Sequence, residues 1–168
     1  DQPPAGRTRA ASDRAYWQKS YSGGPINVAP RAPGLPGDHY KPVVVPNGAA
    51  LPFKIVGGVK VFHLVGEEVD HAFDSGLRAK CWGYNGRVNS TVIEAVEGER
   101  VRIYVTNRLS VATSVHWHGF NLPNGMDGVG GLTQPYIKAG DTAKYEFTLR
   151  QYGTQMFHSH HDEMTQMG

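Results

Sequence analysis

Apolar and polar residues alternate at every second position in several stretches of the chain, and this period predicts β-strands. The clearest case is residues 100–107, where Val101, Ile103 and Val105 would form the buried face. Further strands are predicted at residues 56–65, 91–96, 143–149 and 155–158. We find no helical period longer than about two turns. The pattern therefore predicts an all-β domain built from short strands.

Details of these runs fix the expected faces and turns. In residues 56–65, Val59, Val61 and His63 are expected to face the same way. In residues 143–149, the side chains expected to point inward are Tyr145, Phe147 and Leu149. Turns are predicted at residues 97–99 and 139–141, and a short apolar run, residues 43–45, stops at Pro46.

Composition supports this picture and excludes some functions. The 168 residues include 21 glycines and 11 prolines, which suits a turn-rich β protein better than a helical one. Basic and acidic residues are nearly balanced, 17 against 15, which argues against a nucleic-acid partner. No apolar run reaches the roughly 18–20 residues of a membrane span. The single cysteine, Cys81, excludes an internal disulfide.

The first 40 residues differ from the rest because they are rich in proline and glycine and lack any period. We expect residues 1–40 to form an irregular arm, and residues 41–168 to form the β domain. The alternative is an ordered wrap over the domain, anchored by Tyr16, Trp17 and Tyr21.

Two histidine pairs carry the chemical information. His116 and His118 flank Trp117, and His158 and His160 flank Ser159. Residues i and i+2 of a strand point to the same face, so each pair would present two imidazoles together. Imidazole is a preferred ligand of copper, zinc, iron and nickel. Two such strands side by side would suit a cluster of several metal ions better than one structural zinc, which usually takes cysteine ligands.

Around these pairs the sequence resembles a known family. The motif His-Trp-His-Gly at 116–119 is followed by Asp-Gly at 127–128, Thr-Gln at 133–134 and His-Ser-His at 158–160. Upstream, residues 82–86 and 96–101 look like early strands of the same domain. Together they resemble the first cupredoxin domain of multicopper oxidases, over about residues 55–168. The ending at 160–168 is closest to a bacterial laccase-like subgroup.

The resemblance implies a cupredoxin-like Greek-key β-sandwich or barrel and assigns roles to the motif residues. In the family, eight histidines from the first and last domains hold three copper ions. By motif, His116 resembles a type 2 copper ligand. His118, His158 and His160 resemble type 3 copper ligands. Asp127 matches the family's acidic residue, which would orient ligands or water and help deliver protons.

Neighbouring residues are expected to support the pairs rather than bind metal. Trp117 should face away from its two histidines and pack in the core, and Gly119 should permit a tight turn. His161 lies off the face of His158 and His160, so a supporting or surface role is expected. For Asp162 and Glu163, hydrogen bonds to ring nitrogens and a solvated turn are equally open.

The family takes in electrons at a type 1 copper held within a His-Cys-His stretch. Cys81 has no histidine close by in sequence, so we expect a small, partly buried core residue there rather than a copper ligand. The chain is therefore predicted to be the N-terminal part of a longer multicopper oxidase, inactive alone. Further cupredoxin domains, in cis or in trans, would supply type 1 copper and four more histidines.

The full enzyme would reduce O₂ to water while oxidising phenols, amines or metal ions, in the periplasm or outside the cell. Two alternatives stay open. One is a non-catalytic copper-binding or copper-carrying cupredoxin. The other is a β domain stabilised by structural zinc, which would lose its fold on chelation.

Overall fold

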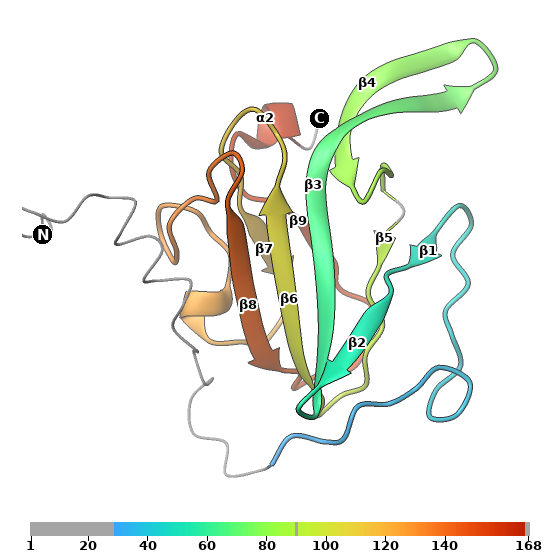
Figure 1. Cartoon of the computed structure of the whole chain (residues 1–168), viewed down its shortest axis with the longest axis vertical. Coiled ribbons are helices and arrows are strands. Elements are labelled where there is room, and N and C mark those ends of the chain that lie inside the picture. The colour runs from blue at the N-terminus through green and yellow to red at the C-terminus, as the bar shows by residue number, and fades with distance from the viewer. Residues whose placement is uncertain (1–28, 90, 167–168) are drawn as a thin grey trace, which may run out of the picture.

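The computed structural model describes residues 29–89 and 91–166. It confirms the all-β prediction, because the only helical elements in this part of the chain are η1 (Asn124–Met126) and α2 (Glu163–Gln166). Neither of these described helices has the length or the apolar character to cross a membrane. The strands are, in chain order (Figure 1), β1 (Ala49–Ala50), β2 (Phe53–Val56), β3 (Val59–Asp74), β4 (Leu77–Tyr84), β5 (Thr91–Val92), β6 (Arg100–Asn107), β7 (Val115–His118), β8 (Thr142–Thr148) and β9 (Met156–Ser159).

A five-stranded sheet forms one side of the domain, in the order β2-β3-β6-β8 with β4 added to β3. β3 and β6 run parallel, and β6 and β8 run antiparallel. The buried face of β6 is the predicted one, Val101, Ile103 and Val105, and β8 buries Tyr145 and Phe147 against it. Leu149 lies just past the end of β8 and packs on the same core. The period-two reading of these two strands is confirmed.

In β3 the side chains that enter the core are the alternate set. Val59, Val61 and His63 share a face, as predicted, but that face is turned away from the core. The inward positions include Phe62 and Lys60, and the Lys60 side chain is completely buried. A buried ammonium is tolerated only with a partner. Lys60 Nζ lies 2.9 Å from the equally buried carboxylate of Glu99.

β3 continues well beyond the expected residue 65 and turns back as β4. The two strands form a hairpin that projects away from the other strands at the upper right of Figure 1. Charged residues occupy most positions of one face of this hairpin, and a bulge lies between Ala72 and Asp74. Cys81 lies half-buried on this hairpin, outside the core cluster, so the expectation of a core position is wrong.

Two short sheets, β1-β5 and β7-β9, are not hydrogen-bonded to the five-stranded one. The predicted strand at 91–96 is reduced to Thr91–Val92, paired in parallel with β1. The apolar run at 43–45 forms no strand, and Val44 is 92% exposed. A cavity of about 640 Å³ separates the segment 91–97 from β9 and is lined by core residues such as Trp117 and Phe147.

The described part of the N-terminal region, residues 29–40, forms no strand and has two isolated bridges, Arg31 with Glu99 and Pro36 with Tyr40. Arg31 N–H donates to Gly98 O at 2.8 Å, and Gly34 N–H donates to the Glu99 carboxylate. The proposed anchors Tyr16, Trp17 and Tyr21 lie outside the described residues. The division at residue 40 stays a prediction.

Candidate metal centre

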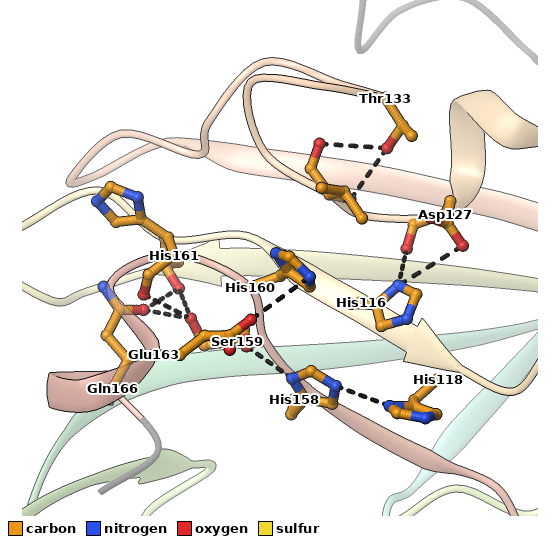
Figure 2. Close-up of polar contacts among 12 residues, drawn as sticks. His116, His118, Asp127, Thr133, His158, Ser159, His160, His161, Glu163 and Gln166 are labelled. Carbon is orange, nitrogen blue, oxygen red and sulfur yellow. Dashed lines mark hydrogen bonds and ion pairs between the residues drawn. The ribbon is translucent and has the colours of Figure 1, made fainter.

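The two histidine pairs come together because β7 and β9 form an antiparallel pair. In its register His116 lies opposite His158, and Val115 lies opposite Ser159. Residues directly opposite each other point to the same side of a sheet, so the two pairs present their imidazoles to one volume. Figure 2 shows the four rings gathered at this place. The predicted convergence of His116, His118, His158 and His160 is therefore present.

The ring spacings show which histidines are closest. The centroid of His116 lies 5.5 Å from that of His118, and 5.4 Å from those of both His158 and His160. Among the described residues, one ligand atom from each of His116, His118 and His158 falls within 4.8 Å of the others. His160 stands beside this triplet, its ring 6.1 Å from that of His158. The three histidines are half-buried or exposed, so the volume opens to solvent.

Main-chain carbonyls fix which nitrogens are free. Nδ1 of His116 lies 2.6 Å from Asp127 O, and Nδ1 of His158 lies 2.7 Å from Ser159 O. A carbonyl oxygen only accepts, so both Nδ1 atoms carry the proton and both Nε2 atoms keep a lone pair. This is the usual way in which outer hydrogen bonds prepare a histidine for metal binding.

Two ring nitrogens of the site have a spacing that one ion could use. Nδ1 of His118 and Nε2 of His158 are hydrogen-bonded to each other at 3.2 Å. Imidazole–metal bonds of about 2 Å place two ligands of a tetrahedral ion about 3.3 Å apart. A set made only of imidazoles suits copper or zinc better than the hard cations, which prefer oxygen ligands. The donor set therefore fits the metal that the sequence predicts.

The loop after η1 packs beside β7 and accepts a hydrogen bond from His116. Asp127 offers its carbonyl to the ring, while its carboxylate Oδ1 is 3.5 Å away, too far for a strong hydrogen bond. Gly128 has φ 86°, and a Cβ at this position would lie 1.7 Å from Val115 O. Only glycine allows this loop to approach β7 so closely. The Thr133 hydroxyl closes the loop by bonding to the N–H and O of Val129.

Trp117 anchors β7 on the opposite side, as predicted. Its side chain is buried, and its ring packs against Tyr145, Phe147 and Phe157 with centroid distances of 5.2–5.9 Å. Gly119 ends the strand with φ 82° and allows the turn in which Phe120 N–H donates to Trp117 O. One strand thus points its histidines outward and its tryptophan into the core.

The residues after His160 support the site from α2. His161 packs against the Tyr136 ring at 4.5 Å and lies outside the triplet. Glu163 Oε1 lies 3.4 Å from Nε2 of His160, which favours the ring-contact alternative for this acid. Sequence reasoning missed Gln166, which bonds to Thr113, Ser159 and the chain before β7. Gln166 lies within the ending at 160–168, but no local pattern assigns it a role, because Thr113 and Ala112 are more than 50 positions away.

Comparison with known proteins identifies the domain. A family model described as multicopper oxidase matches residues 67–168. The chain belongs to the multicopper oxidase family. Membership implies copper binding. Copper resistance protein A of Pseudomonas syringae pv. tomato is 40% identical over 94 residues, which are 56% of this chain and 15% of that protein. Laccase-2 of Botryotinia fuckeliana is 45% identical over 88 residues, 51% of this chain and 15% of its own length.

Solved structures of multicopper oxidases share the fold. The multi-copper oxidase from Pseudomonas Thermotolerans superposes with a TM-score of 0.62 at 29% identity, over 65% of this chain and 27% of that one. The multicopper oxidase mgLAC superposes with a TM-score of 0.58 at 34% identity, over 64% of this chain and 35% of that one. The cupredoxin-like prediction is confirmed. The chain spans about 15% of the two curated multicopper relatives above.

Proposed function

We propose that this multicopper oxidase domain supplies half of a trinuclear copper site. The observation that carries the proposal is the register of β7 and β9, which places His116 opposite His158 and turns both histidine pairs to one side. In this assignment His116 is the type 2 ligand, and the type 3 ligands are His118, His158 and His160. The second half, with the type 1 copper, comes from further cupredoxin domains in cis or in trans.

Bound copper would supply the electron transfer by which O₂, four electrons and four protons become two molecules of water. The electrons would come from four one-electron oxidations of a phenol, an aromatic amine or a low-valent metal ion. The chain's own residues orient the ligands: the carbonyls of Asp127 and Ser159 hold the Nδ1 protons of His116 and His158. The Asp127 carboxylate, 3.5 Å from the same ring, stands where it can pass protons to water at the site.

The relatives named copper resistance protein A and laccase support this activity for the complete protein. We also propose a periplasmic or secreted location, which rests on the family resemblance alone.

Native mass spectrometry of the copper-loaded chain tests the proposal. We expect one or two coppers per 18.4 kDa chain, reduced in His116→Ala and His158→Ala and unchanged in His71→Ala, whose residue lies on the β3–β4 hairpin. A longer protein with the remaining domains should hold about three coppers per completed cluster, and should bind them more tightly than the chain alone. Absence of copper binding in both proteins would refute the proposal.

The same experiment separates the alternatives. A copper-carrying module would bind copper as a lone chain and gain nothing from further domains. A zinc-stabilised domain would prefer zinc and unfold when a chelator removes the metal.

A further inference from the structure

The strand pair that carries the histidines is short, although its register decides where the four imidazoles point. β7 and β9 contribute four residues each, and a two-stranded sheet of this size is marginal by itself. Because the side-chain period is two, a slip of one residue would turn one histidine pair to the opposite face. A contact that joins the two strands outside the ladder would therefore help to hold the register.

Gln166 makes that contact through both ends of its amide. Its Oε1 accepts hydrogen bonds from the hydroxyls of Thr113, at 2.7 Å, and Ser159. Its Nε2 donates to Ala112 O at 2.8 Å. Ser159 is the residue between His158 and His160, and Thr113 precedes β7 by two residues. Figure 2 shows Gln166 beside Ser159, next to the histidines. One side chain thus ties the start of β7 to the middle of the second histidine pair.

The partners of Gln166 are buried, which makes the arrangement specific. Thr113 is 4% exposed and Ser159 is 7% exposed, and their hydroxyl oxygens lie 3.2 Å apart. Buried hydroxyls need partners, and a register slip would leave these two without the shared acceptor. The next link outward is weak, since His160 N–H reaches Ser114 O at only 3.3 Å. Gln166 therefore adds hydrogen bonds at the end of the β7–β9 ladder, where the main-chain bond is long.

The position of Gln166 is set by α2. Asp162, at φ 46°, reverses the chain after the second histidine pair, and its carbonyl accepts the N–H groups of Thr165 and Gln166. This single turn brings Gln166 back over β9. Glu163, in the same turn, reaches His160. The segment after the motif therefore folds onto the strand from which it came.

We propose that Gln166 is a positioning residue of the copper site, which locks the β7–β9 register and so the directions of the four histidines. The proposal rests on the proposed function for its consequence, copper binding, but its physical content is the register. It therefore has a test that needs no metal.

The test compares Gln166→Ala with the control Thr165→Ala. Thr165 is an exposed neighbour in the same turn and takes no part in the side-chain hydrogen bonds of Gln166. In the metal-free chain, we expect amide hydrogen exchange in β7 and β9 to become at least about 10-fold faster in Gln166→Ala, with β6 and β8 unchanged. In the copper-loaded chain, we expect about 10-fold weaker copper affinity. The electron paramagnetic resonance spectrum should contain more copper species in Gln166→Ala than in the wild type.

Gln166→Glu supplies the conservative variant. A carboxylate still accepts from the two hydroxyls but cannot donate to Ala112 O, so exchange and affinity should lie between those of the wild type and Gln166→Ala. This variant also keeps the test open if Gln166→Ala fails to fold.

Two results are distinguishable. Unchanged exchange in β7 and β9 of Gln166→Ala, or faster exchange throughout the domain with an unchanged copper spectrum, would overturn the register lock. A wild-type chain and a longer protein that bind no copper would refute the proposed function, while the exchange result would still decide the role of Gln166.

Discussion

The five-stranded sheet and the β7–β9 pair are held by different forces. In the sheet, long ladders and alternating apolar residues such as Val101 and Ile103 form a core that is buried on one face. The β7–β9 pair has a short ladder, and two of its histidines each donate a single hydrogen bond to a main-chain carbonyl, of Asp127 and of Ser159. Stability therefore resides mainly in one region and the candidate chemistry in the other.

This separation explains how open, polar side chains can be held accurately. Trp117 belongs to both regions, because it lies between two site histidines yet packs against Tyr145 of β8. Val115 and Trp117 anchor β7 in the core, while the histidine rings are oriented by contacts with loops. Damage to the sheet should lower folding stability without changing the metal site of the folded molecules. Damage to the loops should change the metal site as well.

The largest effect is expected from Lys60→Met in the five-stranded sheet. The change leaves the buried Glu99 carboxylate without its 2.9 Å partner, which should lower the free energy of unfolding by about 3–5 kcal/mol. Chemical denaturation measures this loss. Lys60→Met combined with Glu99→Gln should lose less, because no charge is stranded. Weaker copper binding by the folded Lys60→Met protein would contradict the separation of the two regions.

Gly128→Ala should disturb the other region. Its Cβ would clash with Val115 O, and its φ of 86° adds strain, so we expect a loss of about 3 kcal/mol together with weaker copper binding. Gly76→Ala is the matched control, because Gly76 has φ 82° but open space around it. The control should lose only about 1 kcal/mol and keep its copper affinity. Equal effects at the two glycines would show that the clash is unimportant.

Glu146→Gln tests the sheet through pH. Burial would raise the pKa of Glu146, but hydrogen bonds from Arg102 at 2.7 Å and Arg100 at 2.9 Å outweigh it and hold the pKa below its usual value. A carboxyl whose pKa is lowered by folding contributes stability above its unfolded pKa of about 4.3, and this contribution is lost as pH falls through the folded pKa. The variant should lose about 1–3 kcal/mol at pH 7.

Thermal unfolding at several pH values measures the effect. The difference between wild type and Glu146→Gln should shrink as pH falls below about 4. A difference that stays constant down to pH 2 would show that the ion pairs are not its source.

Asp127→Asn is expected to have the smallest effect. His116 Nδ1–H donates to the Asp127 carbonyl at 2.6 Å, which the variant keeps, while the carboxylate lies 3.5 Å away. Copper affinity of this chain should change by less than about threefold. Isothermal titration calorimetry with a competing chelator measures the copper affinity. A change above about tenfold would assign the carboxylate, rather than the carbonyl, to holding the ring.

Local patterns determined much of this domain in advance. The period of two in residues 100–107 gave the strand and its buried face, since alternation reports burial directly. The spacing of His116 and His118 placed both on one side of a strand, and Trp117 on the other, for the same reason. The motif resemblance then predicted a family that the comparisons confirm.

The tertiary structure decided what depends on distant partners. Only packing showed that β3 turns Lys60 inward and Val61 outward, because a buried lysine requires Glu99, which is 39 positions away. Only the β7–β9 register brought the two histidine pairs together, and only the fold of α2 brought Gln166 to Thr113. Sequence alone determined which side chains share a face, because that follows from backbone geometry. Which faces meet was decided by contacts that no local period encodes.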